Sequence, residues 1–201
     1  MLNNNNSEPT KLELINRAFA PKNESIDILF LHPPTSAGVD YSHRYGKKDL
    51  GELQGDLIPL GIATLAAYLR ESGFGVAALD CIPLGLSHKE IVEIIREKKP
   101  KSIGISATTY ALPASTTLCE RLRTEFPNLL IILGGAHANV AGMHAAKNIP
   151  AVDIVSYHPE GESVILHLMQ SFSKHKHNRN SFLKDIDELK KIKGIIFKDN
   201  Q

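Results

Sequence analysis

The sequence contains no tryptophan and only two cysteines, and none of its apolar runs approaches the ~20 residues that would cross a bilayer. Cys81 and Cys119 are too few and too far apart for a disulfide framework or a structural zinc site, so we expect both to be small buried side chains. The start of the chain is polar and Asn-rich and lacks the apolar stretch of a signal peptide. These absences predict a cytoplasmic protein.

An excess of charge of one sign is also absent, because the formal net charge at pH 7 is +1. Such a balance does not indicate a nucleic acid or an anionic membrane as partner, and we expect neither. Apolar residues make up 42% of the chain and charged residues 22%, which is typical of a globular domain that buries a sizeable core.

The sequence also lacks the best-known site motifs of α/β proteins. It has no Gly-x-Gly-x-x-Gly of a dinucleotide site, no Gly-x-x-x-x-Gly-Lys-Ser/Thr of a nucleotide site and no Gly-x-Ser-x-Gly of a hydrolase. A phospho-receiver domain would need acidic residues after its first strand, where this chain has His32-Pro33. We therefore do not expect a dinucleotide-binding protein, a P-loop nucleotide-binding protein, a hydrolase of this type or a phospho-receiver domain.

Short, nearly continuous apolar runs rich in Ile, Leu and Val are present instead, and they are typical of strands that are buried on both faces of a parallel sheet. The sequence predicts five such strands, over 26–31, 76–79, 102–106, 129–133 and 152–156. A further strand is predicted over 194–197. The chain divides into a partly disordered leader over 1–25 with one short helix, a domain over 26–172, and a polar linker with the terminal strand over 173–201.

Amphipathic helical segments lie between the predicted strands. Ser87 and Glu90 form a capping-box pattern at the start of one of them, and Gly73 and Pro100 follow the ends of two. Single helices that alternate with strands imply right-handed crossovers and a parallel sheet. The predicted fold is a doubly wound α/β domain with a parallel five-stranded sheet, Rossmann-like or flavodoxin-like.

Ligands of doubly wound sheets bind at the carboxyl ends of the strands, so these ends are the candidate site. Glycines there let a ligand approach the backbone, and hydroxyl groups donate and accept hydrogen bonds. Together they suit a long, flat organic group that carries a phosphate, although glycines after the fourth strand could instead serve close helix packing. The candidate residues are Pro33, Pro34, Ser106, Thr108, Thr109, Gly134, Gly135, Ala136, His137, Gly161 and Glu162.

Several strings in this order resemble one family. The segment 28–34, which ends in His32-Pro33-Pro34, is similar to the opening of the cobalamin-binding domains found at the N-terminus of radical-SAM enzymes, and 59–70, 103–109, 134–138 and 160–162 continue the likeness. That family includes methyltransferases, ring-forming enzymes and the anaerobic cyclase of bacteriochlorophyll synthesis. Its breadth means that membership does not reveal a substrate.

The resemblance implies that the chain binds cobalamin. The nucleotide tail would insert along the third and fourth strand ends, in a slot lined by Ser106, Thr108, Gly134 and Gly135. The corrin would rest on a rim of Pro33, Pro34, His137 and Gly161. The module would present cobalamin to a radical-SAM catalytic domain, either a partner protein or a domain deleted from this chain, for methyl transfer or radical chemistry.

Two departures refine this expectation. Related cobalamin domains carry Asp-x-His-x-x-Gly, whose His ligates cobalt, whereas here Asp40 to His43 has one residue too many and Ile82 replaces the His after Asp80. We therefore expect cobalamin with its own base displaced from cobalt and no His ligand. The Cys-x-x-x-Cys-x-x-Cys motif is absent, so this chain is expected to hold no iron–sulfur cluster and to be no complete enzyme alone. A docking scaffold without cofactor and a cobalamin-controlled sensor remain the alternatives.

Overall fold

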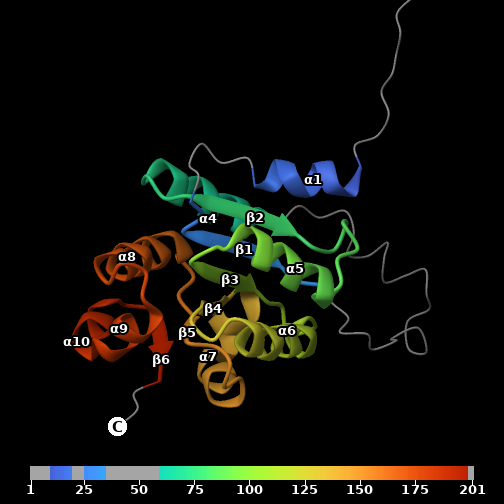
Figure 1. Cartoon of the computed structure of the whole chain (residues 1–201). Coiled ribbons are helices and arrows are strands. Elements are labelled where there is room, and N and C mark those ends of the chain that lie inside the picture. The colour runs from blue at the N-terminus through green and yellow to red at the C-terminus, as the bar shows by residue number, and fades with distance from the viewer. Residues whose placement is uncertain (1–9, 20–24, 35–58, 199–201) are drawn as a thin grey trace, which may run out of the picture.

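The structure is a computed structural model that describes residues 10–19, 25–34 and 59–198. Its centre is a single six-stranded sheet with the order β2-β1-β3-β4-β5-β6 (Figure 1). Neighbouring strands are parallel from β2 to β5, as the sequence predicts, and β6 runs antiparallel to β5. The strands are β1 Ile28–His32, β2 Val76–Asp80, β3 Ser102–Ser106, β4 Leu130–Gly134, β5 Ile154–Ser156 and β6 Ile195–Phe197.

The prediction of five parallel strands is confirmed, and the sheet has one strand more. All five parallel strands are present, and the segment expected over 194–197 joins the same sheet as its sixth strand. The chain reaches this strand after α8, α9 and α10. There it runs antiparallel to β5 and pairs through Ile154↔Phe197 and Ser156↔Ile195.

Helices cover both faces of the sheet. One face packs against α1, α5, α6 and α7, and the other against α4, α8, α9 and α10, each with its own apolar cluster. Side chains of a strand alternate between the faces, so Leu29 and Leu31 of β1 face the first layer while Ile28 and Phe30 face the second. The helices are α1 Lys11–Ala18, α4 Leu60–Glu71, α5 His88–Lys98, α6 Leu112–Glu125, α7 Ala136–Asn148, α8 Gly161–Lys174, α9 Arg179–Lys184 and α10 Ile186–Lys191.

The helix ends follow local sequence signals. The capping box predicted at α5 is present, since Ser87 Oγ accepts from the Glu90 backbone N–H and the Glu90 carboxylate accepts from the Ser87 N–H. Thr10 and Glu13 form a second capping box at α1, inside the predicted leader. Both helices start where these side chains satisfy backbone donors that the first turn leaves free.

The segment after Ser171 differs from the predicted polar linker. Helix α8 continues to Lys174, and α9 and α10 follow it and pack on the sheet. Phe182 and Leu189 are fully buried there. The sequence does not reveal these helices, because residues 173–193 are mostly polar and a six-residue helix contains too few apolar positions to show a helical period.

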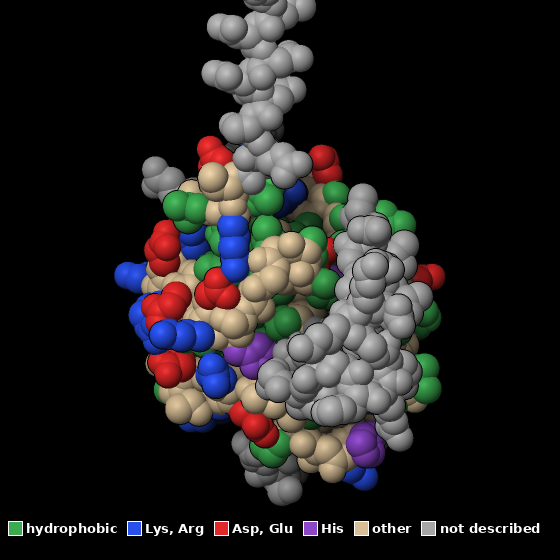
Figure 2. All heavy atoms as spheres, turned by 90° about the vertical axis from the view of Figure 1, so that its right-hand side faces the viewer, with side chains coloured by type: hydrophobic (Ala, Val, Ile, Leu, Met, Phe, Trp, Pro, Cys, Tyr) green, Lys and Arg blue, Asp and Glu red, His purple; other side chains and the backbone are tan. Residues whose placement is uncertain are grey.

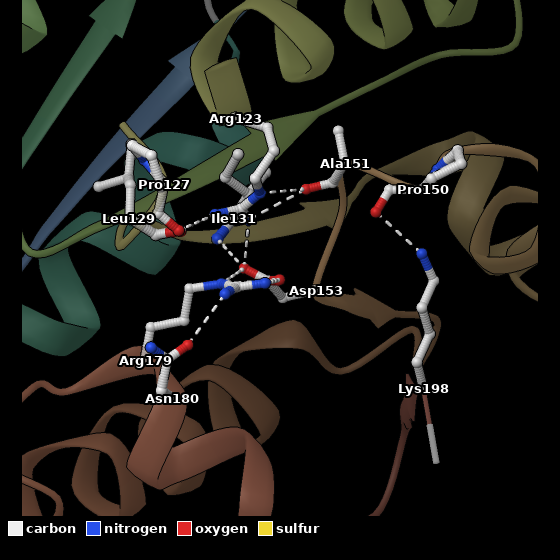
Figure 3. A network of polar contacts seen from close by, with 10 residues as sticks. All are labelled: Arg123, Pro127, Leu129, Ile131, Pro150, Ala151, Asp153, Arg179, Asn180 and Lys198. Carbon is white, nitrogen blue, oxygen red and sulfur yellow. Dashed lines mark hydrogen bonds and ion pairs between the residues drawn. The ribbon is translucent and has the colours of Figure 1, made fainter. Parts of the chain in front are cut away.

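Asp153, just before β5, organises a polar network at the amino ends of β4 and β5 (Figure 3). Its carboxylate is buried and lies 2.7 Å from Arg123 Nη2 of α6 and 2.6 Å from Arg179 Nη2 of α9. It also accepts the Ile131 N–H at 2.9 Å. Two guanidinium groups and one backbone donor therefore compensate for its burial, and they join helices from opposite faces of the sheet.

Candidate functional site

A cavity of about 190 Å³ opens at the carboxyl edge of the sheet, on the face covered by α4 and α8. Figure 2 looks onto the side to which the β2 arrow points in Figure 1, where charged groups gather on one flank and the centre is mainly hydrophobic or uncharged. The cavity is lined by Phe30, Gly61, Ile62, Leu65, Gly104, Ile105, Ser106, Ile132, Gly134, Gly135, Asn139, Ser156, His158, Pro159, Gly161, Glu162 and Ile165.

The sheet contributes two adjacent rows to this lining. The register aligns Phe30 with Gly104 and Gly104 with Ile132, which makes an inner row across β1, β3 and β4. Two residues further along, Ser106 is aligned with Gly134, and this outer row lies at the strand ends. The inner row is apolar and the outer row carries small and hydroxyl-bearing residues, so polarity rises toward the carboxyl edge.

Two glycines shape the sheet face of the cavity. A Cβ at Gly104 would lie 2.6 Å from Cδ1 of Phe30, so the absence of a side chain lets the Phe30 ring lie over β3. A Cβ at Gly134 would meet Ser156 only at 3.9 Å, which is ordinary contact, so Gly134 leaves open space rather than avoiding a clash. The cavity depends on both glycines, for different reasons.

Gly135 has another role. Its φ is +91°, and a Cβ there would lie 2.8 Å from the backbone N of Ala107 and from Oγ of Ser106. The backbones of the two loops are joined around it, since the Ala107 N–H donates to Gly134 O and the His137 N–H donates to Ala107 O, each at 3.0 Å. Close backbone approach at a positive φ requires glycine here.

The helices form the opposite walls. Ile62 and Leu65 of α4 and Ile165 of α8 face the inner row. Gly161 begins α8, and a Cβ at this position would lie 3.2 Å from Cδ2 of Leu65, so the two helices meet tightly at the cavity. An amphipathic stripe on each helix places these side chains inward.

Polar side chains gather at the mouth. Asn139, His158 and Glu162 lie on the segments that follow β4 and β5. Nδ1 of His158 accepts the Glu160 N–H at 3.1 Å, so the proton of the neutral ring is on Nε2. The mouth thereby offers an imidazole donor and a carboxylate beside the hydroxyl groups of the outer row.

The structure brings together only some of the predicted site residues, namely Ser106, Gly134, Gly135, Gly161 and Glu162. Thr108 Oγ1 instead accepts the Ala111 N–H at 3.2 Å, and Thr109 Oγ1 lies 3.1 Å from Nδ1 of the buried His137. These hydroxyl groups stabilise the loop between β3 and α6. The predicted residues that do not line the cavity are Pro33, Pro34, Thr108, Thr109, Ala136 and His137.

Sequence reasoning missed the apolar walls and part of the mouth. Phe30 and Ile132 could have been found, because a period of two places them on one sheet face. Ile62, Leu65 and Ile165 could not have been found. The apolar period of a crossover helix shows which of its side chains are buried, but it does not show which face of the sheet the helix covers. Ser156 ends a strand that the sequence does identify, and Asn139 and His158 follow such strands, so the rule that ligands bind at strand ends was their available signal.

One pair at the edge bears on metal ligation. Nδ1 of His32, the last residue of β1, lies 3.0 Å from Oδ1 of Asp80, the last residue of β2. The same carboxylate oxygen accepts the Ile82 N–H at 3.3 Å, so the Asp of the near-motif Asp80–Gly85 turns the chain and orients His32. The second near-motif, at Asp40 and His43, lies outside the described residues.

The two cysteines are fully buried, as the sequence predicts. Burial raises the pKa of the Cys119 thiol to about 12, and burial likewise raises the pKa of Cys81. Both are therefore protonated at neutral pH and unsuited to bind a metal. Within 10–19, 25–34 and 59–198, no three or more His, Cys, Asp or Glu side chains are grouped so that they could hold a metal ion.

The comparison with protein families shows the class of this domain. The model of the B12-binding domain matches residues 46–168, which include α4, the first part of α8 and every cavity residue except Phe30 of β1. The chain belongs to the B12-binding domain family. The predicted resemblance is confirmed, and the cavity lies at the carboxyl edge of this B12-binding domain.

Curated relatives of the B12-binding domain are longer proteins. An uncharacterized methyltransferase of Pyrococcus horikoshii is 28% identical over 173 residues, 86% of this chain and 33% of the relative. Anaerobic magnesium-protoporphyrin IX monomethyl ester cyclase of Rubrivivax gelatinosus is 28% identical over 143 residues, 71% of this chain and 24% of the relative. The Synechocystis protein of the same name is 28% identical over 176 residues, which are 87% of this chain and 31% of the relative. The chain thus spans a third or less of these relatives.

The lengths and apolar character of the described helices can be compared with what a membrane span requires. Across the part of the chain that the structure describes, none of them combines the length and the apolar character that crossing a bilayer requires.

Proposed function

We propose that this B12-binding domain holds cobalamin and presents it to a radical-SAM catalytic domain, located in a partner protein or joined to this module. The observation that carries the proposal is the cavity between the sheet and α4 and α8, at the edge where doubly wound sheets bind ligands. The methyltransferase and cyclase relatives support it, because this chain matches a part of each.

The residues of the cavity fit the nucleotide tail of cobalamin. The tail is long and narrow, and Gly134 leaves open space for it beside Ser156, while Gly104 makes room for the Phe30 ring that lines the cavity. Ser106, Ser156 and Asn139 can donate hydrogen bonds to the sugar and phosphate at the mouth, while Gly134 lets the tail approach the strand. The corrin would lie over the strand ends, where Pro33 and Pro34 follow β1.

When bound, cobalamin supplies a cobalt centre that can carry a methyl group or assist radical chemistry. The described residues supply positioning for that centre. Their thiols are buried and protonated, so the iron–sulfur cluster of a radical-SAM enzyme would come from the catalytic domain.

We further propose that the lower base is displaced from cobalt and that no His of this chain replaces it. A tail placed in the cavity removes its base from the corrin. His158 already uses Nδ1 to accept a backbone N–H, and His137 is buried against Thr109 outside the cavity lining. His32 is oriented by Asp80 at the end of β1, and we assign this pair to shaping the rim.

Reconstitution tests the proposal. The protein is incubated with hydroxocobalamin, desalted and examined for corrin absorption, and we expect the absorption to remain with the protein. Colourless protein would contradict cobalamin binding. Capture of a radical-SAM protein by that colourless protein would then favour the docking scaffold instead.

A further inference from the structure

The cavity is divided by polarity into a depth and a mouth. Its depth is formed by the inner row of the sheet and by α4 and α8, and each of these side chains is at most half-exposed and carries no polar atom. The residues of the depth are Phe30, Ile62, Leu65, Gly104, Ile132 and Ile165. The polar side chains of the described lining lie at the mouth and are Ser106, Asn139, Ser156, His158 and Glu162.

Backbone groups do not change this division. Gly104 and Ile132 lie inside β3 and β4, and each strand pairs with parallel neighbours on both sides, which occupy its N–H and C=O groups. Leu65 and Ile165 lie beyond the first unpaired donors of α4 and α8, so their backbone N–H groups are bonded along the helix, whereas the N–H of Ile62 belongs to the first turn of α4, at the carboxyl edge of the sheet. A ligand group that reaches past this first turn therefore meets carbon atoms and the Phe30 ring.

From this division we propose that the domain selects cobamides by their lower base, accepting an apolar benzimidazole and discriminating against a base with polar ring edges such as adenine. The inference rests on the proposed insertion of the nucleotide tail. The ribose and phosphate stay at the polar mouth and the base occupies the depth. The ring nitrogens and amino group of adenine lose their water there without gaining partners, whereas the methylated edge of dimethylbenzimidazole loses nothing by leaving water.

Binding of three corrinoids tests the inference. Dissociation constants are measured by absorption titration for cobalamin, for the adenine-containing cobamide and for cobinamide, which lacks the nucleotide and base. We expect cobalamin to bind at least about tenfold more tightly than the adenine form, which corresponds to about 1.4 kcal/mol, and cobinamide to bind more weakly than cobalamin.

Equal affinities for cobalamin and the adenine form would overturn the inference while leaving the proposed function in place. Cobinamide that binds as tightly as cobalamin would also overturn it, because the tail would then lie outside the cavity. If none of the three corrinoids binds, the proposed function fails and the inference fails with it.

A matched pair of variants locates the effect. Ile132 and Ile154 are aligned neighbours on the same sheet face and both are buried, but only Ile132 lines the cavity. Ile132→Thr places a hydroxyl group in the depth, and we expect it to reduce the preference for cobalamin over the adenine form by about threefold or more. Ile154→Thr should leave the preference unchanged. An equal reduction in both variants would assign it to the sheet and would contradict the role of Ile132.

Discussion

At the scale of single residues, the consecutive glycines after β4 have different structural roles. Gly134 borders open space, whereas Gly135 has a positive φ and lies against the backbone of Ala107. The sequence predicts that a bulky residue at either position blocks the ligand and leaves the fold intact. The geometry supports that prediction for Gly134, and for Gly135 it supports the alternative that glycine serves close packing.

We therefore expect Gly134→Leu to keep its fold and lose cobalamin, because the added side chain enters the space of the slot. Gly135→Leu should lower the free energy of unfolding by about 1–3 kcal/mol, because its Cβ overlaps backbone atoms that cannot move aside. Denaturant unfolding followed by circular dichroism, beside a cobalamin titration, separates the two effects. Unchanged cobalamin affinity in Gly134→Leu would remove this residue from the site.

A second prediction at this scale concerns the lower face of cobalt. We expect the electron paramagnetic resonance spectrum of the cobalt(II) form to show no nitrogen splitting from the protein, and His32→Ala to leave it unchanged. The reason is that the motif that supplies a His is interrupted at Ile82. A nitrogen splitting that disappears in His32→Ala would show that Asp80 orients a cobalt ligand, as a carboxylate does for many metal-bound imidazoles.

At the scale of secondary-structure elements, an ion pair connects α1 with α5. Lys11 Nζ of α1 lies 2.6 Å from Glu90 Oε1 of α5, and Ile15 of α1 is buried in the core beside them. The hydrogen bond from Lys11, together with those from Ser87, lowers the pKa of Glu90 to about 2. The leader predicted from sequence therefore contains a helix that is packed on the domain.

Since the pKa of Glu90 is lowered in the folded state, its ionised form stabilises the fold above the usual pKa of 4.5, and this contribution is lost as the pH falls from about 5 to about 2. Solvent screens the exposed pair, so we expect Glu90→Gln to cost less than about 1 kcal/mol at pH 7. The difference between wild type and variant, measured by urea unfolding at each pH, should decrease as the pH falls from about 5 to about 2, where half of the Glu90 carboxyl groups are protonated. A difference that does not depend on pH would contradict the role of the charge.

The helices α9 and α10 provide a second prediction at this scale. Phe182 of α9 is fully buried, and its ring lies 5.4 Å from that of Phe172 in α8. If this segment were a linker, truncation there would have no effect on stability. We expect Phe182→Ala to lower the free energy of unfolding by about 3–5 kcal/mol through the cavity it leaves, while the exposed Lys184→Ala changes little. Denaturant midpoints of the two variants measure this, and equal midpoints would support the linker.

At the scale of the whole molecule, the sequence predicts the parallel sheet because strands buried on both faces need apolar residues at every position, as in Ile103 to Ile105 and Leu130 to Leu133. It also identifies Ser106 and Gly134, because strand ends can be located without knowing the partners of a strand. It cannot place Leu65 beside Ile165, since that neighbourhood arises from two crossovers on the same face. The sequence also does not predict the packing of α9, because a helix this short contains too few periods to be recognised.

The contact between α4 and α8 at the cavity has a consequence for the protein in the cell. These helices are far apart in the sequence, and Leu65 and Gly161 meet where the ligand would lie. A corrinoid seated between them would act as a noncovalent cross-link between early and late parts of the chain. At a free concentration of 100 times its dissociation constant it would add about 2.7 kcal/mol to stability. The steady-state amount of the protein would then follow the corrinoid supply, with the unliganded chain degraded first.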